Sequence, residues 1–239
     1  MNRDKEKNDL FSSLNISYYD MMASQYDSIL NVDKKNISIR NRVAEFFVSQ
    51  VKYGHVVDFG GGTGLDLNWL AKQQYNISFC EPSEAMRMRA INRCRAAFAD
   101  SPIVFLESYQ SNFRTWSAEF PFRQKVNAVL ANFAVFNCIP DIRMLFEKLA
   151  LVLSPGGTIV ALVLDASPAR KLRANFKGTI SSVLTNRPVG FHIDFNGERQ
   201  LVNLYSSLEI RKAARDHFNL VLHKRLSGLG FNLIHLIKK

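Results

Sequence analysis

Short apolar runs, each followed by a polar or glycine-rich turn, recur along the chain. Five of them have the length of a buried strand: residues 55–59, 77–80, 103–106, 126–131 and 158–164. Ahead of the first run, apolar residues fall near helical spacing, as at Ile39, Val43 and Phe47. This pattern predicts an α/β fold in which helices pack against a sheet.

The last third of the chain carries a different pattern. Apolar residues alternate with polar or small ones over residues 189–195 and lead into Asn196-Gly197, a strong signal for a type I′ hairpin turn. A two-residue loop places Asp194 opposite Arg199. Ser206 then stands where it can cap a following helix.

Composition narrows the class of protein. Apolar residues make up 47% of the 239, enough for a normal core, and no run reaches the roughly 18 apolar residues of a membrane span. The N-terminus is polar, unlike a secretory signal. The cysteines, Cys80, Cys94 and Cys138, lie far apart without metal-ligand spacing, so we expect no metal site and a cytoplasmic protein with reduced thiols. The net charge of +10 fits nucleic acid, an anionic substrate or a soluble surface, and does not choose between them.

The most informative stretch spans residues 56–64, which read Val-Val-Asp-Phe-Gly-Gly-Gly-Thr-Gly. A strand, a glycine turn and a helical pattern follow one another here, and glycines allow both tight turns and close approach of a ligand. A phosphate loop would need a following Lys, and the third glycine of a dinucleotide fingerprint would fall at Leu65. The stretch instead places Gly60, Gly62 and Gly64 at alternate positions after an acid, Asp58.

This acidic-x-Gly-x-Gly-x-Gly pattern resembles motif I of the class I S-adenosylmethionine-dependent methyltransferases. The resemblance implies that the loop cradles the methionine part of the cofactor, S-adenosyl-L-methionine, and that Asp58 holds the loop and the amino group. Glu81, followed by Pro82, ends the second apolar run at about 20 residues past the loop, where an acid can accept hydrogen bonds from ribose hydroxyls. Leu-Ser-Pro-Gly-Gly, before the fifth run, resembles motif III of the same family.

The N-terminal segment carries a further resemblance. Residues 19–27 fit the pattern aromatic-Asp-x-x-Ala-x-x-Tyr-Asp, which is similar to the ubiquinone/menaquinone-type branch of these enzymes. In that branch the segment packs over the cofactor pocket and a tyrosine approaches the methionine end, which implies a cofactor contact for Tyr26. The alternative is an amphipathic helix that buries Tyr19, Met22 and Tyr26 on one face.

The chain departs from the family pattern in three places. The Asp that often takes the adenine amino group is missing, and Tyr109 could stack on the base instead. Asn132-Phe133 stands where enzymes acting on nucleobase amines carry Asn/Asp-Pro-Pro-aromatic, which disfavours that chemistry and leaves Asn132 as a cofactor-binding candidate. Asn137 and Cys138 stand where related small-molecule enzymes often show a His pair, so no catalytic His is carried over.

The order and spacing of these motifs imply a Rossmann-like methyltransferase fold. Its sheet would be seven-stranded and mostly parallel with an antiparallel last strand, closed by the runs at residues 218–224 and 232–238. Residues 1–34 would cover the cofactor pocket. Residues 35–239 would form the methyltransferase domain, with a lid insertion at about 166–205.

The resemblance implies an enzyme that methylates a small-molecule acceptor, a metabolite or natural-product intermediate. Two alternatives remain: an RNA methyltransferase, motivated by the charge, and a non-catalytic S-adenosylmethionine-binding protein. If the acceptor is a hydroxyl, a base should remove its proton, and His192 on the hairpin is the first candidate. An ordinary surface histidine is the alternative reading of His192.

The predicted lid has two parts with different chemistry. The first part is basic and holds no acid: Arg170, Lys171, Arg173, Lys177 and Arg187. The second part is the aromatic hairpin. This mixture suits an acceptor with an apolar body and an anionic handle, such as a carboxylate, phosphate or carrier-linked thioester. Alternatively, the apolar face of the hairpin is a homodimer contact. We expect no membrane partner and disfavour nucleic acid.

Overall fold

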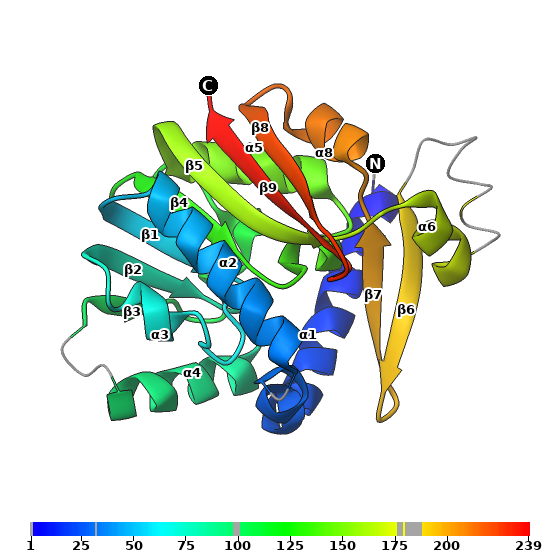
Figure 1. The fold of residues 1–239 in the computed structure, drawn as a ribbon, viewed down its shortest axis with the longest axis horizontal. Helices are drawn as coiled ribbons and strands as arrows, with labels where there is room; N and C mark the ends of the chain where they lie inside the picture. Colours follow the sequence, from blue (N-terminus) through cyan, green and yellow to red (C-terminus); the bar gives the residue numbers. More distant parts are fainter. Residues whose placement is uncertain (1, 32, 98–100, 176–178, 180–187) are drawn as a thin grey trace.

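A single large sheet forms the centre of the molecule in the computed structural model, which describes residues 2–31, 33–97, 101–175, 179 and 188–239. Its strands are β1 (Gly54–Phe59), β2 (Tyr75–Cys80), β3 (Ile103–Phe105), β4 (Val126–Ala131), β5 (Leu153–Leu164), β8 (Phe218–Leu226) and β9 (Phe231–Lys238). The seven strands lie in the order β3-β2-β1-β4-β5-β9-β8 (Figure 1).

The strand directions follow the predicted pattern. β1 to β5 pair in parallel, whereas β9 pairs antiparallel with both of its neighbours, β5 and β8. The last strand of the chain is therefore the one antiparallel strand of this sheet. The predicted Rossmann-like, seven-stranded fold is confirmed.

Helices bury apolar side chains against both faces of the sheet. One core cluster joins the sheet to α2 (Lys34–Gln50), α3 (Leu67–Leu70) and α4 (Glu84–Ala97). The other joins it to α5 (Ile142–Val152) and α8 (Ser207–Ala214). Val56 belongs to the first cluster and Val57 to the second, because successive side chains of a strand point to opposite faces.

Local sequence explains how two of these helices begin. Asp33 caps α2 by accepting a hydrogen bond from the Lys35 backbone N–H at 2.8 Å. Ser206 and Glu209 form a complete capping box at the start of α8, as expected from Ser206. Because β1 to β5 are parallel, their carboxyl ends lie together on one side of the sheet.

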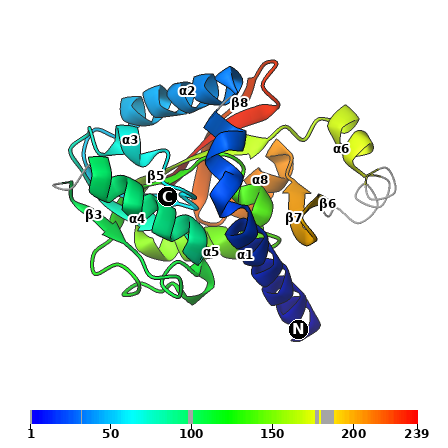
Figure 2. The ribbon, with the colours of Figure 1, turned by 90° about the horizontal axis from the view of Figure 1, so that it is seen from below.

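The long N-terminal helix and the hairpin lie together at that side. α1 (Asn2–Asn31) passes between the sheet and the two-stranded sheet of β6 (Val189–Phe195) and β7 (Glu198–Leu204) (Figures 1 and 2). The hairpin register pairs Asp194 with Arg199, and their side chains form an ion pair at 2.9 Å, so the predicted hairpin is confirmed.

The hairpin is fastened to α1 by both polar and apolar contacts. The Asn15 side chain accepts from the backbone N–H of Leu201 at 2.9 Å and donates to the Cys138 carbonyl oxygen at 2.8 Å. Tyr18 meets Phe195 edge to face at 6.1 Å between ring centroids. The hairpin therefore already uses apolar surface within the chain, and a homodimer contact through it stays a prediction.

The basic part of the insertion binds other segments of the chain. Arg170, on α6 (Pro168–Ala174), donates to the Gly230 carbonyl oxygen at 2.7 Å, and Lys171 pairs with Glu209 at 3.3 Å. Lys177 and Arg187 lie outside the described residues. The acceptor contact expected of these cations, and the lid itself, stay predictions.

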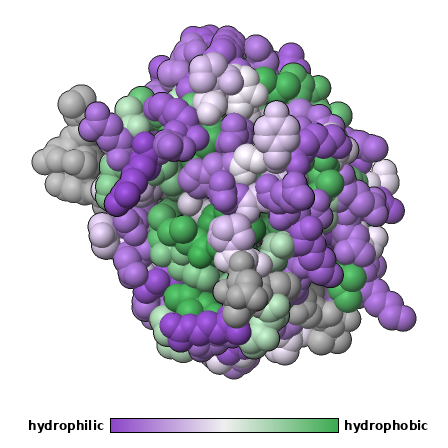
Figure 3. Space-filling view, turned by 90° about the vertical axis from the view of Figure 1, so that its left-hand side faces the viewer, coloured by the Kyte–Doolittle hydropathy of each residue, from purple (hydrophilic) through white to green (hydrophobic). Residues whose placement is uncertain are grey.

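Seen from the side of β3, the surface is largely hydrophilic, with smaller hydrophobic areas between the polar residues (Figure 3). Val104 of this edge strand is exposed. Within the described residues, no helix combines the length and the hydropathy that crossing a membrane requires.

Candidate functional site

A cavity of about 600 Å³ lies at the carboxyl ends of β1, β2 and β4. The strand order reverses between β1 and β4, which is where open α/β sheets bind ligands. Its walls come from α1, from the loops after these strands and from two short helices, η1 (Phe113–Thr115) and η2 (Val135–Cys138). The lining includes seven of the residues that the sequence singled out: Tyr26, Gly60, Gly62, Glu81, Pro82, Tyr109 and Asn132.

The glycines of the loop after β1 serve different purposes. Gly60, Gly62 and Gly64 all have positive φ angles, of 69°, 58° and 77°, which side chains disfavour. A Cβ on Gly64 would lie 2.9 Å from the Cβ of Ala90, so Gly64 allows α4 to pack and lies outside the cavity lining. A Cβ on Gly62 would meet only the Tyr26 ring, at 3.6 Å, so its backbone faces the cavity.

Glu81 fastens this loop to the start of α4. Its side chain accepts from the Gly62 backbone N–H at 2.9 Å and from the Ser83 backbone N–H at 2.8 Å. The residue is only 6% exposed, and this burial raises the pKa of the carboxyl to about 7. Each carboxylate oxygen can accept more than one hydrogen bond, so Glu81 still has acceptor capacity toward the cavity that it lines.

Asp58 lies beneath the loop and outside the cavity lining. It is fully buried, and its Oδ2 atom has no hydrogen-bond partner among the described residues. Burial, followed by the nearby charge of Asp66, raises the pKa of this carboxyl well above its usual range. A Cβ on Gly61 would lie 2.8 Å from Oδ2, so the acid touches the underside of the loop. Its contact with a ligand amino group stays a prediction.

A buried polar cluster beside the loop was not found from the sequence. Asp66 accepts from Trp69 Nε1 at 2.8 Å and from Asn132 Nδ2 at 3.1 Å, and it pairs with Arg40 at 2.5 Å. The Arg40 guanidinium lies over the Phe133 ring, 4.6 Å from its centroid. The position of Asp66, two residues after the last glycine of the loop, was the signal that could have indicated it. Its partner on α2, Arg40, belongs to no local motif.

The segment after β4 has an unusual backbone at the edge of the cavity. Phe133 and Ala134 have φ angles of 51° and 67°, and such conformations cost roughly 1–3 kcal/mol each for residues other than glycine. The Asn132 side chain accepts from the Phe133 N–H at 3.0 Å, and the Ala134 N–H donates to the Leu162 carbonyl oxygen at 2.9 Å. These contacts hold the turn in place, so Asn132 has a structural role beside its place in the lining.

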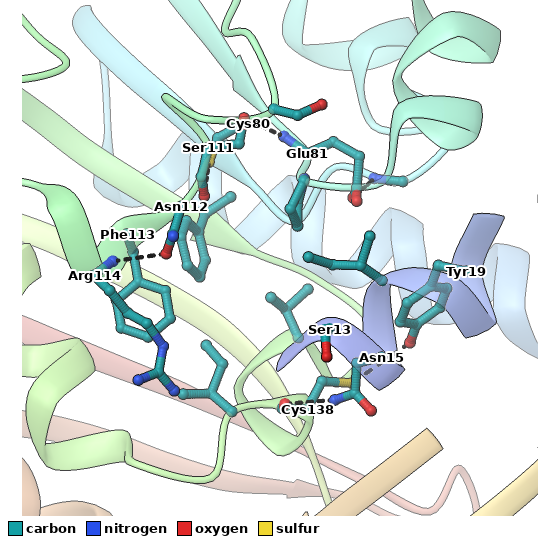
Figure 4. A pocket seen from close by; sticks show the side chains of 18 of the residues that line it. Ser13, Asn15, Tyr19, Cys80, Glu81, Ser111, Asn112, Phe113, Arg114 and Cys138 are labelled. Atoms are coloured by element: carbon teal, nitrogen blue, oxygen red, sulfur yellow. Dashed lines mark hydrogen bonds between the residues drawn. The ribbon is translucent and has the colours of Figure 1, made fainter. Parts of the chain in front are cut away.

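Three polar or aromatic residues surround the cavity next to Glu81, where the expected Asp is missing. Tyr109 is 67% exposed and stacks on Phe120, with ring centroids 6.4 Å apart. Ser111 accepts from the Glu81 backbone N–H through its hydroxyl at 3.2 Å. Asn112 caps η1 by accepting from the Arg114 backbone N–H at 3.2 Å (Figure 4). Ser111 and Asn112 also line the cavity and supply polar groups that the motifs did not indicate.

α1 is tied to the glycine loop and to α4, on the Glu81 side of the cavity, at two points. Asp20 accepts from the Ser83 hydroxyl at 2.6 Å and from the Ala85 N–H at 3.0 Å, at the start of α4. Asp27 accepts from the Thr63 hydroxyl at 2.5 Å and pairs with Arg93 at 2.5 Å. The same helix packs on the domain and lines the cavity, with Tyr19, Met22 and Tyr26 partly buried, and a cofactor contact for Tyr26 stays a prediction.

The opposite end of the cavity is formed by α1, η2 and the residues next to them. Figure 4 shows Ser13, Asn15 and Cys138 on the side away from Cys80 and Glu81, with Tyr19 beside them. The expected base is not part of this wall. His192 is exposed on β6 and lies outside the cavity lining, because β7 is the strand held to α1.

Comparisons with known proteins agree with this geometry. A family model described as a methyltransferase domain matches residues 31–235. DhpI in complex with SAH has a TM-score of 0.68 at 15% identity, covering 95% of this chain and 96% of its own. The 1,6-didemethyltoxoflavin-N1-methyltransferase of Burkholderia thailandensis, bound to 1,6-didemethyltoxoflavin and S-adenosylhomocysteine, has a TM-score of 0.69 at 12% identity, covering 97% and 90%.

The CcbJ methyltransferase of Streptomyces caelestis is a third similar structure, with a TM-score of 0.63 at 16% identity over 82% of this chain and 88% of its own. At such identities the likeness concerns the fold. No curated protein matches the sequence.

Proposed function

The chain belongs to the methyltransferase domain family, and we propose that it transfers the methyl group of S-adenosylmethionine to a small-molecule acceptor. Membership confirms the resemblance to the class I S-adenosylmethionine-dependent methyltransferases. The narrower likeness to the ubiquinone/menaquinone-type branch rests on residues 19–27 and stays a prediction. One observation carries the proposal: Gly62 and Glu81 are bonded to each other where β1 and β2 end, and both face one large cavity.

The residues at this end of the cavity fit the cofactor. Gly62 leaves open backbone that a Cβ would fill, and Glu81 is a buried acceptor for the ribose hydroxyls. Tyr109, Ser111 and Asn112 would surround the adenine. When bound, the cofactor supplies a methyl group on a sulfonium, so that a bond forms from the acceptor to carbon while the carbon–sulfur bond breaks and leaves its electron pair on sulfur.

The protein's task is then to align and enclose the reactants. The glycine loop, fastened by Glu81, fixes one reactant, and α1 forms the wall beyond it. Holding two reactants in line replaces an encounter in solution, and this can lower the activation free energy by roughly 7–11 kcal/mol. Tyr26 lines the cavity between the two ends and would help to exclude water there.

A small acceptor agrees with the size of the site. Small-molecule pockets typically measure roughly 300–1,000 Å³, and this one measures about 600 Å³. The net charge of +10 is the observation behind an RNA acceptor, and we rank it second. No disulfide joins Cys80, Cys94 and Cys138, which supports a reducing compartment, and we propose the cytoplasm.

Calorimetric titration with S-adenosylhomocysteine, without added metal, tests the cofactor site. We expect binding to the parent protein and its loss in Gly62→Ala, because the new methyl group enters the cavity beside Tyr26. Gly156→Ala is the matched control, since its φ of 70° imposes similar backbone strain while its Cβ meets nothing within 4 Å. A parent protein that binds a nicotinamide cofactor and no S-adenosylhomocysteine would refute the proposal.

A second measurement separates an enzyme from a cofactor-binding protein. Mass spectrometry of the purified protein should identify a bound acceptor or product, and that compound is then incubated with S-adenosylmethionine. Formation of its methylated product supports catalysis. Binding of the cofactor without turnover of any bound compound would favour the non-catalytic alternative.

A further inference from the structure

A cluster of three side chains closes the end of the cavity opposite Glu81. Tyr19 from α1 and Cys138 from η2 line the cavity, and Gln200 from β7 lies behind them. Gln200 Nε2 lies 2.6 Å from the Tyr19 hydroxyl oxygen and 3.0 Å from Cys138 Sγ. The Tyr19 oxygen and Cys138 Sγ are 3.5 Å apart (Figure 4). The motif at residues 19–27 includes Tyr19 but implies a ligand contact only for Tyr26, and no motif gives a role to Cys138 or Gln200.

The hydrogen atoms of this cluster can be assigned one by one. An amide nitrogen carries two donors, and Gln200 directs them to the Tyr19 oxygen and to Cys138 Sγ. Cys138 can in turn donate its weak S–H to the Ala134 carbonyl oxygen at 3.6 Å. The Tyr19 O–H is then left with sulfur at 3.5 Å, a poor acceptor, or with a ligand in the cavity.

The charge state of the cluster makes Tyr19 a donor. Burial raises the pKa of Tyr19 well above 10, and the neighbouring Cys138 and Tyr26 reinforce the shift. Burial also raises the pKa of Cys138 and of Tyr26. Around neutral pH these groups therefore keep their protons, and the nearest carboxyl of the lining, Glu81, stands at the cofactor end.

The same wall offers little to remove a proton from an acceptor. Among the described residues that line the cavity there is no histidine. Glu81 lies at the opposite end of the cavity, bonded to the backbone N–H groups of Gly62 and Ser83. The wall around Tyr19 therefore suits an acceptor oxygen that is already ionised when it binds.

We propose that Tyr19, held by Gln200, donates a hydrogen bond to a negatively charged oxygen of the acceptor, which is a phenolate, enolate or carboxylate. This inference rests on the proposed function. The oxygen uses one electron pair to bond the methyl carbon, and the pair of the broken carbon–sulfur bond stays on sulfur. The negative oxygen and the positive sulfonium become a neutral methylated oxygen and a neutral thioether, so no proton has to leave.

The balance of charge also predicts which kinetic constant Tyr19 affects. Negative charge on the oxygen decreases toward the transition state, so a hydrogen bond to it is stronger in the bound ground state. Removing the donor should therefore raise KM without lowering kcat. Gln200 acts through Tyr19 as a positioning residue, and its loss should shift KM in the same direction by a smaller factor.

Binding of 4-nitrophenol to the S-adenosylhomocysteine complex tests this without turnover, because its phenolate and neutral forms absorb at different wavelengths. We expect the parent complex to bind the phenolate and to increase the ionised fraction. Tyr19→Phe should weaken this binding about tenfold or more, as expected for one hydrogen bond to a charged group. Gln200→Met should weaken it less. Benzoate and acetylacetonate, read by calorimetry, represent the carboxylates and enolates.

Tyr18→Phe is the matched control, because it removes one hydroxyl from the adjacent residue, which lies outside the cavity lining and packs against Phe195. Calorimetry with S-adenosylhomocysteine on each variant separates the two proposals. A parent protein that does not bind it defeats the proposed function. If it binds and Tyr19→Phe leaves anion binding unchanged, only the present inference fails. Tighter binding of benzylamine than of all three anions, or binding of none, also overturns it.

Discussion

The two ends of the cavity are built in different ways. At the proposed cofactor end, Glu81 and Gly62 are 19 residues apart and meet through a side chain and a backbone N–H. At the opposite, proposed acceptor end, Asn15 and Leu201 are 186 residues apart, and Tyr19 and Cys138 are 119 apart. The first end follows from how neighbouring strands of one sheet finish. The second end exists only where α1, η2 and β7 have come together.

This difference teaches where specificity can change in such a molecule. The cofactor end relies on backbone geometry, as in the left-handed conformations of Gly60 and Gly62, which few substitutions permit. The acceptor end relies on side chains presented by helices and a hairpin. Substitutions there can alter the acceptor while the cofactor end remains intact, so variants should separate the two ends.

Glu81→Ala should show the largest difference between the effects on the two ends of the cavity. It removes the acceptor for two ribose hydroxyls, and the cost of roughly 1.5–3 kcal/mol for charged hydrogen bonds corresponds to about a 10- to 100-fold weaker binding of S-adenosylhomocysteine. The free energy of unfolding without ligand should also fall, because the Gly62 and Ser83 N–H groups lose their partner. Calorimetry and urea unfolding measure the two effects.

Glu84→Ala provides the control, since it removes an exposed carboxylate from the first turn of the same α4. Its effect on cofactor affinity should stay within a factor of about three. Equal affinity of parent and Glu81→Ala protein would show that Glu81 serves the fold alone.

At the other end, Asn15→Leu should have the next largest effect. The variant keeps the side chain's size but loses the hydrogen bonds to Leu201 and Cys138, which leaves buried backbone groups unpaired. We expect the free energy of unfolding to fall by roughly 1–3 kcal/mol. Acceptor use should fall, while affinity for S-adenosylhomocysteine changes little. Gln25→Leu, at an exposed position of α1, should change neither stability nor binding, and an Asn15→Leu protein as stable as the parent would contradict the assigned contacts.

Cofactor affinity measured over a series of pH values tests the cofactor end alone. In the proposed complex, ribose hydroxyls donate to ionised Glu81, whose pKa is raised from 4.5 to about 7. Cofactor affinity should therefore rise up to about tenfold per pH unit below about pH 7 and level off above it. Glu81→Gln should abolish this slope. A slope that persists in Glu81→Gln would assign it to another group.

The raised pKa of Glu81 has the opposite effect on the ligand-free protein: its stability should fall as pH rises, whereas cofactor affinity should rise. Between pH 4.5 and about 7 the folded protein holds a proton on Glu81 that the unfolded chain has lost. The contribution of this group to the free energy of unfolding therefore decreases as pH rises through that window. Urea unfolding of the parent and of Glu81→Gln isolates this contribution.

The smallest effect is expected where α1 meets the glycine loop. Asp27→Asn keeps the shape but removes the charge that faces Arg93, and partly exposed ion pairs contribute less than about 1 kcal/mol. Cofactor affinity should fall by a factor of about two to five, and less at high salt. Asp194→Asn likewise removes the charge of one ion pair, the exposed pair with Arg199 at the hairpin turn, and should leave cofactor affinity unchanged. Equal cofactor affinity of the two variants would show that the contact between α1 and the glycine loop does not affect cofactor binding.

Those features of the fold that depend on neighbouring residues were predictable from the sequence. The β6–β7 register followed from Asn196-Gly197, whose φ angles of 48° and 87° suit a type I′ turn. The strand ends at Phe59 and Cys80 followed from apolar runs that stop before a glycine and an acid. The helical pattern after the loop spans residues 65–72, but the helix itself is shorter, Leu67–Leu70, since the chain is still turning at Gly64.

The parts of the site that depend on distant partners were not predictable. His192 was chosen because it sits on the predicted lid opposite an apolar face, but that pattern does not say which strand of a hairpin meets α1, and His192 lies outside the cavity lining. Asp66 and Arg40 have no shared motif, and their pairing follows from how α2 packs beside the loop. Gln200 has no signal at all in the sequence, because its role comes from Tyr19 and Cys138.

On the ribosome, α1 is synthesised long before the strand that holds it. The 186 residues between Asn15 and Leu201 take roughly 10–40 s to add at about 5–20 residues per second. During that interval the strands that frame the glycine loop are already available, whereas Tyr18 and Asn15 still lack their partners in the β6–β7 hairpin. A nascent chain can therefore complete the cofactor end first, and the acceptor end closes only when elongation has passed the hairpin.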